Sequence, residues 1–114
     1  MPDPNIVFWA GIPDGSKLTA TAKKQAGSAG TFAIAGYLHD EASNHQKVTK
    51  VPFVANLATN HTYQLVLELL PVGGAVVDVE VKIESGGSVI RKTAWAPVQG
   101  SAGLRGVFVR TERD

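Results

Sequence analysis

The sequence of 114 residues contains no cysteine. This absence excludes disulfides, thiol catalysis, Cys-x-x-Cys redox chemistry and thiolate metal ligands together. No apolar run approaches the ~20 residues that a membrane-spanning helix needs, so we expect no membrane span. A secretory signal, with a basic region followed by a long apolar one, is not visible at the start of the sequence. Localisation therefore stays open between a cytoplasmic protein and the mature form of a secreted protein.

An excess of charge of one sign is also missing, because 11 Lys and Arg residues are balanced by 10 Asp and Glu residues. The basic residues are scattered, and they do not alternate with aromatic side chains as they do in sheets that bind RNA or single-stranded DNA. We therefore expect no nucleic-acid partner. Hydrophobic residues make up 44% of the chain, which is too apolar for disorder. Its length predicts a single domain over residues 1–114.

Helical periodicity is absent as well. Apolar residues instead alternate with polar ones in period two, between short groups of Gly, Pro, Asn and Asp, which is typical of strands. Pro52 lies inside one predicted strand and cannot donate to a sheet ladder, so that strand is expected to be an edge or to carry a bulge. Gly86-Gly87 predicts a two-residue hairpin of the primed type. The predicted strands span residues 5–12, 17–24, 31–38, 47–56, 62–71, 77–84, 88–97 and 104–111.

About eight strands with short connections indicate an antiparallel all-β domain, because parallel neighbours need long crossovers. Two closures compete: a two-sheet β-sandwich of the immunoglobulin-like or jelly-roll type, and an up-and-down β-barrel. We favour the sandwich. A barrel this small would show the same in–out alternation on every strand, whereas the strands at 5–12 and 31–38 break it.

The segment from Leu57 to Leu65 reads Leu-Ala-Thr-Asn-His-Thr-Tyr-Gln-Leu. It resembles the tyrosine corner of immunoglobulin-like and fibronectin-type sandwiches. In those folds a Leu and a Tyr bracket a turn, and the tyrosine hydroxyl bonds back to upstream backbone. The corresponding pair in this chain would be Leu57 and Tyr63. The resemblance concerns the fold and implies no activity.

The densest polar cluster is His39, Asp40, Glu41 and His45. Imidazole and carboxylate groups at such spacing could hold zinc or another divalent ion, as a small metal-dependent enzyme would require. A solvated hairpin loop explains the same residues, and we expect no metal or other cofactor. If the strands at 31–38, 47–56 and 62–71 form a meander, this loop and His61 lie ~30 Å apart, at opposite ends of the middle strand. The three histidines would then not share one metal.

Catalytic motifs are missing from the rest of the chain. Gly27-Ser28-Ala29-Gly30 is not the nucleophile elbow of the α/β-hydrolases, and there is neither a P-loop nor a dinucleotide-binding glycine pattern. We therefore assign no catalytic residue.

The chain has more apolar β-surface than a two-layer sandwich can cover. Phe8 and Trp9 are adjacent and would point to opposite faces of a regular strand, and the strand at 31–38 is apolar on both faces. Such surplus surface often marks a partner or ligand site. The candidates for an apolar outer surface are Trp9, Ala33, Ala35, Tyr37, Val66 and Trp95, with Arg91 beside Trp95.

Three explanations of this surplus remain open. A bulge or register shift could turn one tryptophan inward. The surface could be a subunit interface, in which sheets pack face to face across a two-fold axis. It could also be a platform on which Trp and Tyr stack against sugar rings. We expect a non-enzymatic binding or assembly module that forms a homo-oligomer or binds a protein partner. A lectin-like, glycan-binding module and the metal-dependent enzyme are the alternatives.

Overall fold

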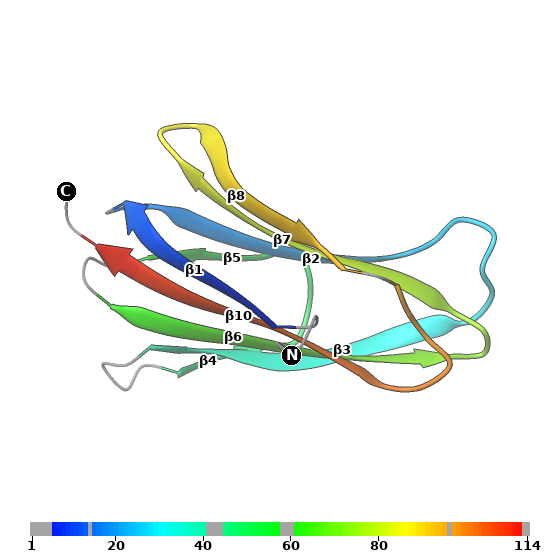
Figure 1. Cartoon of the computed structure of the whole chain (residues 1–114). Coiled ribbons are helices and arrows are strands. Elements are labelled where there is room, and N and C mark those ends of the chain that lie inside the picture. Colours follow the sequence, from blue (N-terminus) through cyan, green and yellow to red (C-terminus); the bar gives the residue numbers. More distant parts are fainter. Residues whose placement is uncertain (1–5, 14, 41–44, 58–60, 96, 113–114) are drawn as a thin grey trace.

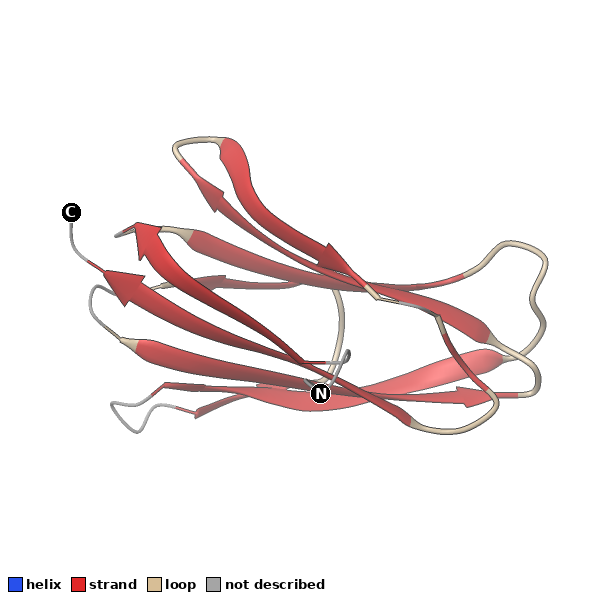
Figure 2. Cartoon of the chain, viewed as in Figure 1, coloured by secondary structure: helices blue, strands red, loops and turns tan. Residues whose placement is uncertain are grey.

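The computed structural model describes residues 6–13, 15–40, 45–57, 61–95 and 97–112. All regular elements of this part of the chain are strands (Figure 2). It contains no helix that could cross a membrane. The strands are β1 (Ile6–Pro13), β2 (Lys17–Lys24), β3 (Thr31–Asp40), β4 (His45–Val48), β5 (Phe53–Asn56), β6 (Thr62–Val72), β7 (Val76–Ser85), β8 (Ser88–Ala94), β9 (Val98–Gln99) and β10 (Gly103–Glu112).

The strands form two five-stranded sheets that pack against each other (Figure 1). Sheet A has the order β1-β10-β6-β3-β4. Sheet B has the order β5-β2-β7-β8. The short strand β9 pairs with Val76 and Val77 at the start of β7, before the residues of β7 that pair with β8. The all-β two-sheet sandwich is confirmed, and the alternative of a single up-and-down barrel is wrong.

The predicted strand at 47–56 is in fact two strands that belong to different sheets. β4 ends at Val48 on the edge of sheet A, and β5 begins at Phe53 on the edge of sheet B. The cis Val51–Pro52 bond lies between them. Because proline has no N–H to donate, the ladder stops here and each half takes an edge position. The edge location is confirmed, whereas the continuous strand is wrong.

One strand pair departs from the antiparallel expectation. β1 runs parallel to β10, with Ile6 beside Gly106 and Phe8 beside Phe108. Parallel neighbours need a long connection, and the expectation considered only strands that follow one another in the chain. Here the whole domain between β1 and β10 serves as the connection. Sheet A is therefore mixed, with β1 as one edge.

The core lies between the sheets and follows the predicted alternation. Every second residue is buried from Tyr63 to Leu69 in β6 and from Val77 to Ile83 in β7, and the intervening positions face outward. Leu57 and Tyr63 are both buried, as expected for a tyrosine corner, although the turn at 58–60 lies outside the described residues. Gly86 and Gly87 have φ angles of 59° and 83°, and Ser85 pairs with Ser88. The primed hairpin is thus confirmed.

Candidate functional site

Sheet A is apolar on both of its faces. On each strand the buried residues alternate with residues that point away from sheet B, because successive side chains of a strand lie on opposite sides. Nothing in the described structure covers the second side. We call it the outer face, and its apolar residues are Ile6, Phe8, Ala33, Ala35, Tyr37, Val66, Leu70, Val72, Leu104, Gly106 and Phe108.

Phe8, and not Trp9, is the aromatic residue of β1 on the outer face. The Phe8 side chain is 75% exposed, and its ring stacks on that of Phe108 with centroids 4.9 Å apart. Trp9 is partly buried and packs against the core. A register shift between Trp9 and Ile12 lets both of these side chains point inward. The bulge explanation therefore holds for Trp9, and its expected outward position is wrong.

Trp95 and Arg91 lie away from the outer face. Trp95 directly follows β8, its backbone N–H donates to the Val79 carbonyl oxygen at 3.3 Å, and its ring packs against the core. Arg91 is an exposed residue of β8 in sheet B, and its guanidinium bonds the adjacent Ile90 carbonyl oxygen. The structure thus brings together Ala33, Ala35 and Tyr37 on β3, and separates them from Trp9, Trp95 and Arg91.

The outer face has a hollow over β10, between β1 and β6. Gly106 of β10 lies in register between Ile6 of β1 and Val66 of β6. Because glycine has no side chain, the surface dips at this point. The resulting apolar hollow has a volume of about 210 Å³, and Leu104 and Phe108 border it along β10.

Two fixed charges of the outer face lie on β6 and β10, and a third, Lys47, lies on the edge strand β4, paired with Tyr37. Glu68 of β6 is exposed and pairs with Leu104. Arg110 of β10 pairs with Thr62, and its Nη1 donates to the Thr62 hydroxyl at 3.1 Å. Between these two levels the described side chains of β1, β10, β6 and β3 carry no Lys, Arg, Asp or Glu on this face.

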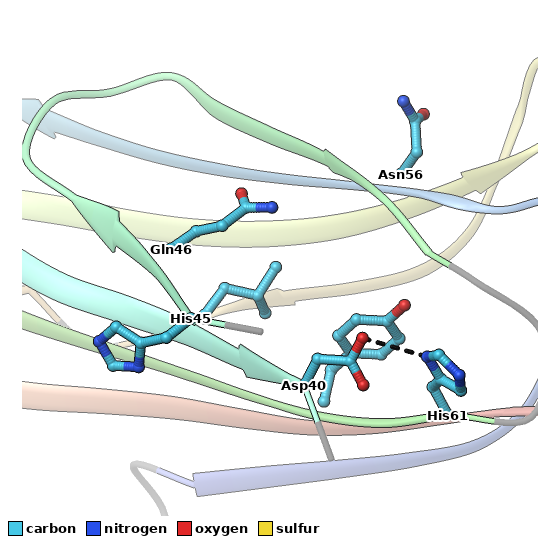
Figure 3. Close-up of a pocket in the computed structure, with 7 residues that line it drawn as sticks. Asp40, His45, Gln46, Asn56 and His61 are labelled. Atoms are coloured by element: carbon cyan, nitrogen blue, oxygen red, sulfur yellow. Dashed lines mark hydrogen bonds and ion pairs between the residues drawn. The ribbon is translucent and has the colours of Figure 1, made fainter. Parts of the chain in front are cut away.

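A polar pocket of about 380 Å³ opens at the end of β3, and it is the second candidate site (Figure 3). His61 Nδ1 lies 3.1 Å from Asp40 Oδ2, and the Asp40 side chain is only 9% exposed, against 31% for His61. A buried carboxylate requires a hydrogen-bond donor, and the imidazole N–H of His61 can supply one. The residues that line the pocket are Leu38, Asp40, His45, Gln46, Asn56, His61 and Tyr63.

The proximity of Asp40 and His61 overturns the expected ~30 Å separation between the two loops. That estimate required one continuous strand at 47–56 between the loops. In the structure the chain changes sheets after β4, and β6 pairs directly with β3, so that Asp40 lies beside Tyr63. The start of β6 is therefore next to the end of β3.

The candidate metal ligands do not converge on one point. His39 and His45 pair across β3 and β4, with ring centroids 5.9 Å apart. The His45 ring also stacks on Tyr37, and it points away from the Asp40–His61 pair (Figure 3). Asp40 faces inward, and Glu41 lies outside the described residues. Among the described residues, no group of three or more His, Cys, Asp or Glu side chains is placed to hold a metal ion.

The pocket also offers little for nucleophilic catalysis. A His–Asp pair can serve as a general base when a nucleophile lies within hydrogen-bond reach. No Ser, Thr, Cys or Lys is among the described residues that line the pocket. We therefore regard the Asp40–His61 pair as a link that fastens the start of β6 to the end of β3.

Sequence reasoning missed the most exposed part of the outer face. Phe8 was considered only as the neighbour of Trp9, and Leu104, Gly106 and Phe108 were not assigned to a face. A usable signal existed, since Val107 and Val109 alternate with these three residues along the strand.

Comparisons of the chain with protein-family models, with curated proteins and with solved structures found no match. The function is therefore argued from the outer face and the pocket themselves.

Proposed function

We propose that this protein is a non-enzymatic assembly module that associates with a second copy of itself through the outer face of sheet A. The observation that carries this proposal is the exposure of Phe8, whose ring is stacked on Phe108 and open to solvent on its other side. A pair of stacked aromatic rings within a continuous apolar sheet surface is typical of interface centres.

The layout of charge favours a second copy over an unrelated partner. Glu68 and Arg110 lie on either side of the levels of Gly106 and Phe8, which carry no fixed charge on β1, β10, β6 and β3. Opposite charges on either side of these levels come to face each other when one copy of the surface is turned end over end on another. Closed two-fold dimers use such self-complementary patches, because the same residues contribute from both subunits.

Replacement of Phe8 by Asp tests the proposal. It places a charge within the apolar surface that the partner would cover, and loss of a buried aromatic residue of an interface costs about 2 kcal/mol or more, equivalent to at least about thirtyfold in the dissociation constant. Light scattering coupled to size exclusion should give twice the 12.0 kDa chain mass for the unaltered protein and the single chain mass for F8D.

Val89→Asp is the matched control. Val89 is 51% exposed on β8 of sheet B, so its replacement adds the same charge at an exposed apolar site off the outer face. This variant should remain dimeric. An unaltered protein that stays monomeric at all accessible concentrations would contradict the proposal, as would dissociation caused equally by V89D.

A further inference from the structure

The register of sheet A allows positions on the outer face to be assigned to levels along the strands. Glu68 and Leu104 share one level, and Gly106 shares the next outward-facing level with Ile6 and Val66. Phe8 and Phe108 form the level after that, followed by Thr62 and Arg110. The first and last levels are six residues apart on β10, or about 20 Å at ~3.3 Å per residue.

We infer that the two copies pack with their sheet A strands antiparallel, about a two-fold axis that lies between the two outer faces and crosses the strands at the level of Val107. This inference rests on the proposed self-association. A rotation about that axis exchanges the level of Glu68 with that of Arg110. It also exchanges the level of Phe8 with that of Gly106.

The first consequence is electrostatic. Glu68 of one copy lies opposite the Arg110 level of the other. The Arg110 guanidinium extends from β10 over β6, where it donates to the Thr62 hydroxyl, so its charge lies over the strand that carries Glu68. A two-fold axis that runs along the strands would instead place Glu68 of one copy at the level of Glu68 of the other. Like charges that face each other oppose association.

The second consequence concerns shape. The exposed Phe8 ring falls opposite the level of Ile6 and Gly106 in the other copy, where the apolar hollow of about 210 Å³ is open. The axis that pairs the charges therefore also sets the most exposed large hydrophobic side chain opposite the level of this hollow. Charge and shape are independent features of the sequence, and both indicate the same axis.

The test uses charge reversal with rescue by mixing. In Glu68→Arg, two arginines face each other at each end of the interface, and in Arg110→Glu two glutamates do. Each variant alone should bind itself at least tenfold more weakly than the unaltered protein. An equimolar mixture of the two should form a heterodimer, since each end of the interface then holds one arginine from the first variant and one glutamate from the second. The double variant in one chain should also dimerise.

Sedimentation of each variant and of the mixture separates the possible failures. If neither reversal weakens a dimer that F8D abolishes, the face is used but the proposed axis is wrong. If both reversals weaken association and mixing fails to restore it, the axis is wrong as well. If the unaltered protein is monomeric, the proposed function itself fails. Thermal denaturation of each variant, measured on dilute protein, checks that the reversals leave the fold intact.

Gly106→Val provides a second readout for the hollow. A Cβ at Gly106 would have only ordinary contacts, 3.5 Å from the Leu65 carbonyl oxygen and 3.7 Å from Ile6 Cγ1, so the fold should tolerate the new side chain. Filling the hollow should weaken the dimer at least tenfold without lowering the stability of the monomer. Unchanged association of this variant would overturn the assignment of Phe8 to the hollow.

Discussion

At the scale of single residues, the contact between His61 and the buried Asp40 carboxylate predicts that removal of His61 destabilises the fold. His61→Ala removes a hydrogen-bond partner from a carboxylate that is almost fully enclosed. Because a buried acceptor loses one of its hydrogen-bond donors, we expect the free energy of unfolding to fall by about 1–3 kcal/mol. Urea denaturation followed by tryptophan fluorescence measures the change.

A control substitution at His39 and a double-mutant cycle between His61 and Asp40 test this prediction further. His39→Ala alters an exposed histidine on the outer face and should change stability by no more than about 0.5 kcal/mol. In a double-mutant cycle, His61→Ala should cost less in the Asp40→Ala background, with a coupling of about 0.5–3 kcal/mol. Strict additivity of the two substitutions would show that the 3.1 Å contact contributes nothing to stability.

Which face of a sheet a residue occupies can be predicted from the sequence only where the alternation along its strand is regular. Ala33, Ala35 and Tyr37 lie on the predicted side of β3, because regular alternation runs through the whole strand. For Phe8 and Trp9 alternation alone cannot choose which ring faces the core. The choice depends on pairing with β10, a hundred positions away in the chain, and no local pattern contains it.

Gly36 illustrates a related error of interpretation. From the sequence alone, the small residues Ala33, Ala35 and Gly36 of this strand predict a surface that a partner can approach closely. A Cβ at Gly36 would instead clash with the backbone carbonyl oxygen of Val66 on the neighbouring strand. The missing side chain therefore serves the contact between β3 and β6, and the close approach is within the sheet.

At the scale of elements, the β7–β8 hairpin gives a prediction about its turn. Gly86 has a φ of 59°, the left-handed region in which Asn is well tolerated and β-branched residues are not. A Cβ at Gly86 meets nothing within 4 Å, so backbone preference alone decides the outcome. Gly86→Asn should be neutral or stabilise the fold by up to about 1 kcal/mol, because it restricts the unfolded chain.

Gly86→Val is the comparison for this hairpin. Valine incurs the left-handed cost of roughly 1–2 kcal/mol and gains no compensating contact. Thermal unfolding should therefore give Gly86→Asn a higher midpoint temperature than Gly86→Val. The reverse order would mean that the primed geometry does not persist in solution.

Some strands can be predicted from the local sequence, whereas others depend on contacts between distant parts of the chain. β6 and β7 are predictable because their alternation is uninterrupted and ends at glycine turns. The division of residues 45–56 into β4 and β5 is not, since Pro52 signals an edge without indicating that the chain crosses to the other sheet. The polar pocket depends on that crossing, and so the contact between Asp40 and His61 escapes sequence reasoning.

At the scale of the whole molecule, the outward-facing sides of the two sheets differ in polarity. The outward positions of β7 in sheet B alternate Asp78, Glu80, Lys82 and Glu84, which suits contact with water. The outer face of sheet A lacks such a pattern across its middle. Surplus apolar β-surface was predicted from the sequence, and its location on sheet A follows from the pairing of β1, β10, β6 and β3.

Self-association through this face should couple assembly to stability. A partner that binds only the folded chain stabilises it by about 2.7 kcal/mol when the protein concentration is a hundredfold above the dissociation constant. For a domain of this size, that corresponds to a rise of roughly 10 °C or more in the midpoint temperature. Calorimetry on the unaltered protein should therefore show a midpoint that rises with concentration, because each copy is the ligand of the other. The Phe8→Asp variant should melt at one temperature throughout, whereas Val89→Asp should follow the unaltered protein. A midpoint independent of concentration in all three would mean that the exposed ring of Phe8 faces water in the working form of the molecule.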